Sequence, residues 1–250
     1  MIAAVLSEKD EIETYFPKNS AWFDLNDNSE VESGDSGRFM TQTVDSDKIK
    51  VYQAEGTVIP IFSEHGMSTK ETIENNGYIG MIALGDSKTA SGNLIIDCDM
   101  KSKTPTPENS ETYNLKNINF EYNHVQFSHD EIIVDLENAP EHSPVGQKNT
   151  LDGFFINGFK AELAPTNDVV SVEAKFYLPD RNFGDEVLTE CWFDRELGAI
   201  QIKFSDEFLL VKSQVENEGT SDALRVFIDF HGSFGYQCGE KSLSESLIFV

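Results

Sequence analysis

The chain has 250 residues, enough for one large domain or two modest ones with hydrophobic cores of their own. Lysine and arginine number 19 against 44 aspartate and glutamate residues, which leaves a formal net charge of −25. A surface with this charge repels phosphate backbones and anionic lipids, so we expect neither nucleic acid nor a membrane as a partner. Hydrophobic residues make up 39% of the chain, with 18 phenylalanines, which separates it from disordered acidic sequences.

The first part of the chain has little regular periodicity. Residues 1–6 form an apolar run that lacks the basic flank of a signal peptide, and no segment approaches the roughly 18 apolar residues of a membrane span. The compartment therefore stays unknown. The best helix candidate, Ser7 to Thr14, has only Ile12 as an apolar anchor, so helix should be scarce. Turn-rich breaks at 26–37, 64–77, 101–110 and 138–150 favour a domain boundary within 68–78.

Alternation of apolar and polar residues dominates the rest of the chain and indicates strands with one solvated face. It predicts strands within 118–122, 132–136, 170–178, 200–204 and 224–230. The loop from Asp194 to Ala199 contains Gly198 and predicts a hairpin between the flanking strands, 187–193 and 200–204. The expected fold class is all-β, with two antiparallel β-sandwich-like domains in tandem and very little helix.

The three cysteines, Cys98, Cys191 and Cys238, are odd in number and widely spaced. They form no Cys-x-x-Cys pair and have no histidine at zinc-ligand spacing, so the pattern predicts neither a disulfide framework nor a zinc site. Cys98 and Cys191 lie within apolar alternation and are expected to be buried, inert thiols.

Two further pairs of residues are candidate metal ligands. His124 and His129 are five residues apart, which places them on opposite faces of a continuous strand. Asp97 and Asp99 share a face, but they offer only two of the six to eight oxygens that calcium requires. We therefore expect no metal site and no cofactor.

Two polar or glycine-rich segments and one aromatic group complete the candidate sites. The segment 141–143, Glu-His-Ser, lies in a proline-flanked loop with no third group to complete a catalytic triad. The segment 232–236, Gly-Ser-Phe-Gly-Tyr, opens no helix and so lacks the context of a phosphate site. Trp192, Tyr177 and Phe193 could form a sugar-stacking platform, although core packing is the expected role for most of the aromatic residues.

Four segments, in order, carry a family pattern. Residues 1–6 are Met-Ile-Ala-Ala-Val-Leu, and residues 15–24 contain Tyr-Phe-Pro-Lys and then Trp-Phe-Asp. Residues 47–60 are Asp-Lys-Ile-Lys-Val-Tyr-Gln-Ala-Glu-Gly-Thr-Val-Ile-Pro, and residues 81–99 run from Met-Ile-Ala-Leu to Asp-Cys-Asp. Together they resemble the region that follows the catalytic barrel in glycoside hydrolase family 31, the α-glucosidase and α-xylosidase family. The sequence departs from the family pattern at Lys50, where a proline is usual, and after Asp97.

The resemblance implies a remnant of the last barrel strand at 1–6, a proximal β-domain at 7–75 and a distal β-sandwich domain at 76–250. In this family the C-terminal β-domains brace the barrel and carry none of the catalytic carboxylates, so no catalytic residue is expected here. The run Trp-Phe-Asp-Leu-Asn-Asp at 22–27 looks like the family's nucleophile motif, but its neighbours belong to the post-barrel region. Asp24 is therefore expected to be structural.

The expected function is that of a non-catalytic partner of a (β/α)8 barrel, carried on another chain or on a cleaved fragment, in a complex that hydrolyses α-glucosides. An exposed barrel strand would leave apolar side chains in water, so Ile2, Val5 and Leu6 are expected at the partner interface, and Trp22 is assigned to the same interface. A free-standing carbohydrate-binding module that takes oligosaccharides and a structural or assembly protein derived from the glycosidase are the alternatives. Family members are often lysosomal, secreted or in the secretory pathway.

Overall fold

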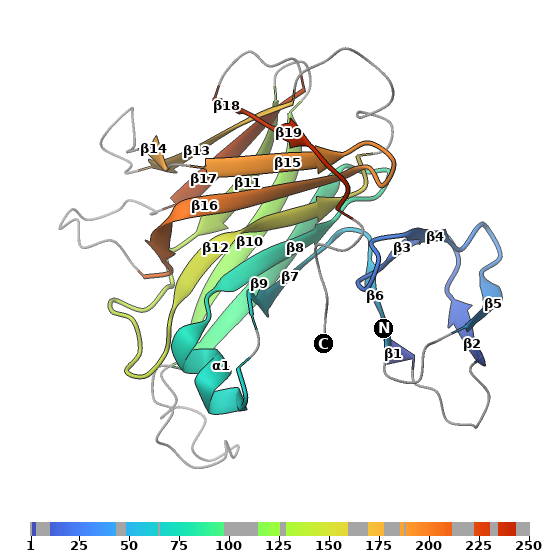
Figure 1. The fold of residues 1–250 in the computed structure, drawn as a ribbon, viewed down its shortest axis with the longest axis horizontal. Helices are drawn as coiled ribbons and strands as arrows, with labels where there is room; N and C mark the ends of the chain where they lie inside the picture. The colour runs from blue at the N-terminus through green and yellow to red at the C-terminus, as the bar shows by residue number, and fades with distance from the viewer. Residues whose placement is uncertain are drawn as a thin grey trace.

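The computed structural model describes residues 2–3, 11–43, 49–64, 66–97, 115–125, 129–159, 170–177, 186–187, 189–211, 223–230 and 235–243. Within these ranges the chain is all-β, with one short helix (Figure 1). The first seven strands are β1 (Ile2–Ala3), β2 (Glu11–Phe16), β3 (Ala21–Asp24), β4 (Glu30–Glu32), β5 (Arg38–Thr43), β6 (Lys50–Ala54) and β7 (Thr57–Phe62). The helix α1 (Thr69–Asn75) is followed by β8 (Tyr78–Ala83), β9 (Thr89–Asp97), β10 (Leu115–Val125), β11 (His129–Asp135), β12 (Thr150–Asn157) and β13 (Ser171–Tyr177). The last strands are β14 (Glu186–Val187), β15 (Thr189–Asp194), β16 (Ala199–Leu209), β17 (Ala223–Asp229), β18 (Tyr236–Gln237) and β19 (Gly239–Glu240).

The first six strands form a small unit beside the main body of the molecule (Figure 1). A four-stranded sheet has the order β1-β6-β3-β4, and β2 pairs with β5 in a separate two-stranded ribbon. The core of the small unit consists of Phe16, Val31 and Tyr52, with Trp22 and Met40 packed against it. The rings of Phe16 and Tyr52 meet edge to face with centroids 4.9 Å apart, an arrangement that aromatic pairs favour.

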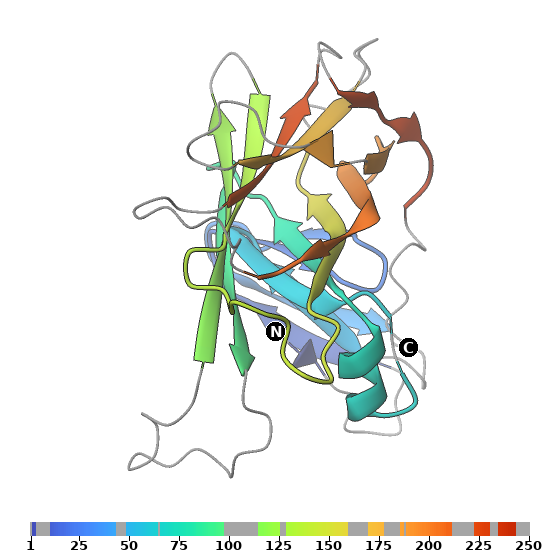
Figure 2. The same cartoon turned by 90° about the vertical axis from the view of Figure 1, so that its left-hand side faces the viewer.

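The remaining strands form one large sheet in the order β14-β13-β17-β11-β10-β9-β7-β8-β12-β16-β15-β19, with β18 on β13. Figure 2 shows this sheet folded over itself, so that β9, β10 and β11 lie in a layer opposite β8, β12 and β16. Between the layers is a continuous apolar core that includes the fully buried Phe120, Tyr122, Phe154 and Phe159. The large sheet is therefore a sandwich that nearly closes into a barrel.

The strands predicted from alternation are present. In β10 the buried side chains are Ile118, Phe120 and Tyr122, and in β11 they include Ile132 and Val134. The predicted hairpin is confirmed, because β15 pairs antiparallel with β16 and the Gly198 amide donates to the Asp194 carbonyl at 2.9 Å. Gly198 has a φ of 67°, the left-handed conformation that glycine adopts without strain.

The helix α1 lies inside the segment predicted as a turn-rich break. Ser68 caps it by accepting a hydrogen bond from the Glu71 amide at 3.2 Å, and the Glu71 carboxylate accepts one from the Met67 amide at 2.9 Å. A serine followed three residues later by a glutamate is a sequence signature of a helix start, so this helix could have been predicted. No helix in the described part of the chain is long and apolar enough to cross a membrane.

Two features of the large sheet do not follow from alternation. The strand β8 runs parallel to β12, with pairs from Tyr78–Leu151 to Ala83–Asn157 and a bulge between Leu151 and Gly153, although most neighbouring strands are antiparallel. Furthermore, β7 pairs with β8, so the chain joins the large sheet at Thr57. The predicted boundary between the two domains at residue 75 stays a prediction.

Cys191 and Cys238 form a disulfide bond across 47 residues of sequence, so the prediction of unpaired cysteines is wrong for this pair. The reason is topological. The strand β19 lies parallel to β15, with Gly239 opposite Trp192, and this pairing brings Cys238 beside Cys191. Nothing in the spacing of the two cysteines indicates that pairing. Cys98 lies outside the described residues.

Candidate functional site

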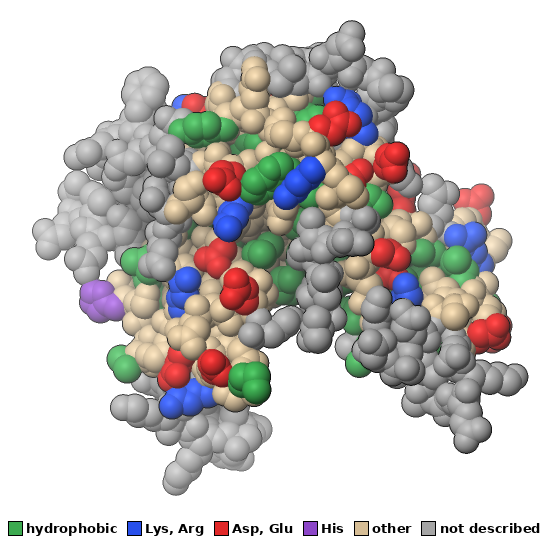
Figure 3. Space-filling view, viewed as in Figure 1, with side chains coloured by type: hydrophobic (Ala, Val, Ile, Leu, Met, Phe, Trp, Pro, Cys, Tyr) green, Lys and Arg blue, Asp and Glu red, His purple; other side chains and the backbone are tan. Residues whose placement is uncertain are grey.

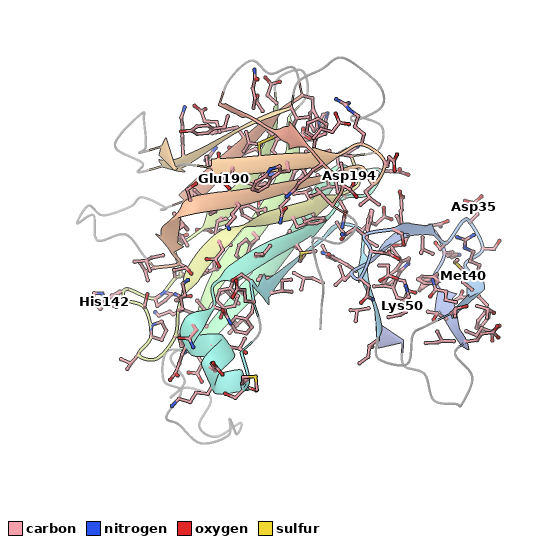
Figure 4. The ribbon with its side chains drawn as sticks, in the orientation of Figure 1. Asp35, Met40, Lys50, His142, Glu190 and Asp194 are labelled. Atoms are coloured by element: carbon pink, nitrogen blue, oxygen red, sulfur yellow. A yellow bond between two sulfur atoms is a disulfide. The ribbon has the colours of Figure 1, made fainter. Side chains whose placement is uncertain are left out.

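Asp24, the aspartate of the nucleophile-like motif, ends β3 with a buried side chain. One carboxylate oxygen accepts hydrogen bonds from the backbone and side-chain nitrogens of Asn26, both at 2.9 Å. The other oxygen pairs with the Lys50 ammonium, which also lies 3.9 Å from Asp27 (Figure 4). Lys50, the departure from the family pattern, is therefore the ion-pair partner of Asp24, and both carboxylate oxygens are occupied by interactions within the chain.

Tyr52 lies beside this pair, in the core of the small unit. Its hydroxyl donates to the Gln42 side-chain oxygen. Burial, together with the nearby Asp24 carboxylate, raises the pKa of Tyr52 to about 12. The phenol is therefore neutral at physiological pH and serves as a buried hydrogen-bond donor.

The structure does not bring Trp192 and Phe193 together, because adjacent residues of a strand face opposite sides of the sheet. Phe193 is buried in the sandwich core. Trp192 lies on the outer face, where the Lys241 ammonium sits 3.9 Å from its ring centroid. Tyr177 ends β13, opposite Ala223, and its side chain is outside the described residues. One face of the Trp192 ring is thus already covered by a cation.

The predicted interface residues are distributed between an edge strand and a core. Ile2 lies in β1, which pairs antiparallel with β6 through the register Ile2–Val51. Trp22 packs in the core of the small unit, 6.2 Å from the Phe16 ring, with its indole nitrogen buried. Val5 and Leu6 lie outside the described residues. Ile2 and Ala3 are therefore part of the small unit through strand pairing with β6.

A second apolar cluster joins the small unit to the large sheet, and we call it the seam. It consists of buried side chains from five separate segments: Leu25, Met81, Phe155, Ala199 and Leu243. Leu25 comes from the small unit, and Met81, Phe155 and Ala199 lie on the outer face of the large sheet. A hydrogen bond also links the two parts at the seam, since the Gln53 side-chain nitrogen donates to the Met81 backbone carbonyl at 2.9 Å.

The C-terminal strap, residues 235–243, closes the seam. Its Leu243 amide donates to the buried Asp194 carboxylate at 2.8 Å, and its Leu243 carbonyl accepts from Asn28 of the small unit at 3.2 Å. Asp194 also accepts from the backbone amides of Glu196 and Leu197 in the hairpin loop. Figure 4 shows Asp194 at the end of the large sheet that lies nearer the small unit. Leu243 thus links Asp194 of the large sheet to Asn28 of the small unit, and sequence alternation indicated neither contact.

The histidine candidates lie in different strands, so the assumption of one continuous strand is wrong. His124 is in β10 opposite Asp130 of β11, and its Nδ1 lies 2.6 Å from the Asp130 carboxylate. The Tyr122 hydroxyl donates to the other oxygen of this buried carboxylate. Among the described residues there is no group of three or more histidine, cysteine, aspartate or glutamate side chains that could hold a metal ion. Asp99 is outside the described residues.

The other candidates lie at the surface. Glu141, His142 and Ser143 are exposed and line a shallow hollow with Lys116 (Figure 4). Only 235–236 of the glycine-rich segment 232–236 are described, with Tyr236 in β18 paired to β13. Figure 3 shows acidic and basic side chains interspersed with hydrophobic ones on the outer face of the sheet.

No protein-family model matches the chain, and no curated protein sequence matches it either. Solved structures do match. The glucosidase II alpha subunit bound to Tris superposes with a TM-score of 0.56 at 13% identity, covering 88% of this chain and 21% of that one. The Flavobacterium johnsoniae GH31 dextranase in complex with isomaltotriose gives a TM-score of 0.53 at 13% identity, over 90% of this chain and 25% of the dextranase.

The chain shares the fold of one part of these glycosidases. A further match, with a TM-score of 0.54 and 13% identity, is the ER glucosidase II heterodimeric complex of a catalytic subunit and the binding domain of a regulatory subunit. Here too the match covers 88% of this chain and 21% of that one. The chain therefore spans about a fifth to a quarter of the length of these matched proteins, and their family is the one that the four sequence segments resemble.

Proposed function

We propose that this chain is a non-catalytic C-terminal β-domain portion of a family 31 α-glucosidase-like protein and that it braces a catalytic (β/α)8 barrel. The observation that carries the proposal is the unequal coverage, 88% of this chain against 21% of the glucosidase II alpha subunit. Retaining glycosidases need two carboxylates about 5 to 5.5 Å apart. In the proposed complex the barrel supplies them and hydrolyses α-glucosides with retention.

The proposed division of labour is supported by the environment of Asp24. A nucleophilic carboxylate must present an oxygen to the sugar, whereas the two oxygens of Asp24 are held by Asn26 and Lys50. Asp24 therefore fixes the turn after β3 and the position of β6. In this proposal residues 1–6 derive from the last barrel strand, 7–75 form the proximal domain and 76–250 the distal one.

A brace must be stiff, and the seam provides stiffness. The small unit is connected to the sandwich by apolar packing at Leu25, by the Gln53–Met81 hydrogen bond and by the Asn28–Leu243 hydrogen bond. These three contacts come from different loops and strands of the small unit. The two parts would therefore meet a barrel as one body.

Isoleucines beside the seam offer an apolar surface to the barrel. Ile61 and Ile79 are half-buried against the seam. Ile59 precedes Ile61 by two residues on β7 and is 40% exposed. In the small unit, Ile49 precedes the half-buried Val51 by two residues and is exposed. We propose this row as the surface that a barrel covers, together with Ile2, Val5, Leu6 and Trp22.

Native mass spectrometry of the chain purified from its own source tests the proposal. The expected result is a stoichiometric partner that carries a Trp-x-Asp-Met-Asn-Glu motif in a barrel sequence, with α-glucosidase activity in the complex. A chain that travels alone, or with unrelated proteins only, would overturn the bracing role.

A matched pair of variants tests the surface. Ile59→Asp should reduce recovery of the barrel partner at least tenfold, because it puts a charge into an apolar contact. Ile95→Asp is the control, since Ile95 is exposed on β9 in the opposite layer of the sandwich and should leave recovery unchanged. Equal loss of partner in both variants would refute the assignment of this surface.

A further inference from the structure

An aromatic pair is exposed on the ribbon formed by β2 and β5. Tyr15 and Phe39 are direct cross-strand neighbours, and their ring centroids are 4.9 Å apart at an interplanar angle of 49°. Their exposed fractions are 46% and 65%, although the other aromatic residues of this ribbon and its neighbours pack into the core of the small unit. The pair lies on the outer face of the ribbon, because Ile12, Thr14 and Phe16 fill the inner face.

The backbone at Gly37 leaves room for the Tyr15 side chain. A Cβ at this position would lie 2.6 Å from the Tyr15 hydroxyl oxygen, closer than the 3.0 Å below which Cβ atoms are essentially never found. Gly37 also has a φ of 71°, so a glycine suits the turn before β5 for two reasons. The Tyr15 hydroxyl therefore lies against the backbone at Gly37, while much of the side-chain surface remains in water.

The side chains next to the two rings can form hydrogen bonds. The next pair along the same face is Glu13 and Thr41, and the one after it is Glu11 and Thr43, all exposed. Successive pairs on one face of a strand are roughly 6.7 Å apart. An apolar platform is thus followed, within one residue pair, by a carboxylate that accepts hydrogen bonds and a hydroxyl that donates or accepts them.

We propose that Tyr15 and Phe39 form a binding platform for a neutral oligosaccharide, with a pyranose packed against the exposed parts of the two rings. The C–H face of the sugar contacts the rings, and its hydroxyls donate to Glu13 and exchange hydrogen bonds with Thr41. Anionic sugars are excluded because the carboxylates of Glu11 and Glu13 repel them. This function is independent of the bracing role and gives the chain a ligand of its own.

A protein partner fits this face less well. Specific protein interfaces bury roughly 800 Å² on each side around an apolar centre in which charged residues are depleted. The outer face of this ribbon has only the two rings, followed immediately by Glu13 and Glu11. A small ligand with an apolar face and a hydroxyl rim matches both the size and the chemistry of this surface.

Isothermal titration of the full chain with isomaltotriose, maltotriose and trigalacturonic acid tests the platform. We expect binding of at least one neutral trisaccharide and none of the acidic one. The Tyr15→Ala/Phe39→Ala variant should bind at least tenfold more weakly, whereas Phe39→Tyr, which keeps the ring, should bind like the wild type. Because both rings are exposed, the double variant should keep its circular dichroism spectrum.

Two controls separate this platform from its competitors. Trp192→Ala should retain sugar binding, since Trp192 lies on the large sheet beneath Lys241. Loss of binding in Trp192→Ala with retention in the Tyr15 and Phe39 variant would overturn the proposal. It would also be overturned if neither neutral trisaccharide bound at 10 mM, on the order of the weakest affinity such a site would need. Sedimentation of a wild-type dimer that the double variant abolishes, without sugar binding, would reassign the pair to self-association.

Discussion

Replacing Lys50 with methionine measures what the buried ion pair contributes to the small unit. The Asp24 side chain is 2% exposed and that of Lys50 is 18% exposed, so the substitution leaves a carboxylate out of water with only its two Asn26 donors. Removing one partner of a fully buried pair costs about 3 to 5 kcal/mol. Because Lys50 keeps some contact with water, we expect the lower end, about 3 kcal/mol.

The assay is urea unfolding followed by the fluorescence of Trp22, in a Trp192→Phe background that silences the large sheet. Asp24→Asn should cost less, about 1 to 2 kcal/mol, because the Lys50 ammonium can turn toward water and Asp27. The Asp24→Asn/Lys50→Met double variant should be more stable than Lys50→Met alone, since no unpaired charge remains buried. A Lys50→Met variant within 0.5 kcal/mol of its parent would refute the ion-pair argument.

The Asp24→Asn substitution also tests the structural role of Asp24, in a complex with glucosidase activity. Asp24→Asn should leave turnover unchanged at temperatures where the variant is folded. Abolished turnover with unchanged unfolding would show that Asp24 is catalytic, and the proposed division of labour would fail.

Four other perturbations have definite expected outcomes. Replacing both Cys191 and Cys238 with alanine should lower the free energy of unfolding by about 4 kcal/mol, from the loop-entropy relation for a separation of 47 residues. An unchanged melting temperature in this variant would contradict the expectation. Leu243→Ala should cost about 3 kcal/mol by leaving a cavity in the seam, measured by urea unfolding, and a cost under 1 kcal/mol would mean that the strap is not packed as described. The pKa of Tyr52 is about 12 in the native state and about 10 in the unfolded state, so the free energy of unfolding should fall as the pH rises from 10 to 12. Tyr52→Phe should lack the contribution of this phenol to the fall. Parallel pH profiles for the two proteins would refute this expectation. Ser68→Ala should cost about 1 kcal/mol through its lost helix cap, with Thr69→Ala as a nearby control of smaller effect in the same thermal assay.

The strands of the sandwich were predictable because the alternation of apolar and polar residues within each strand indicates which face is buried. Ile118, Phe120 and Tyr122 alternate with polar residues, and the core selects that face in β10. The hairpin loop was equally local, since Gly198 marks the position of positive φ. Even the helix had its signature in Ser68 and Glu71, which a search for capping residues finds.

The contacts that connect distant segments could not be predicted in this way. The parallel pairing of β8 with β12 and the meeting of Cys191 with Cys238 depend on where whole strands lie in the sheet. The exposed pair of Tyr15 and Phe39 is similar, because 24 residues separate the two rings and only the register of β2 on β5 makes them neighbours. Sequence patterning specifies which side of a strand is buried, whereas strand order decides which side chains meet.

The disulfide also bears on where this chain can mature. Both half-cystines are buried, at 5% and 9% exposure, and the bond ties the strap to β15. Cytosolic glutathione and thioredoxin keep such thiols reduced, whereas the endoplasmic reticulum, the periplasm and the extracellular space allow them to pair. Protein produced in a reducing cytosol would therefore carry two free thiols at this point and a strap held by hydrogen bonds and packing alone. The covalent attachment of the strap to β15 therefore depends on an oxidising compartment.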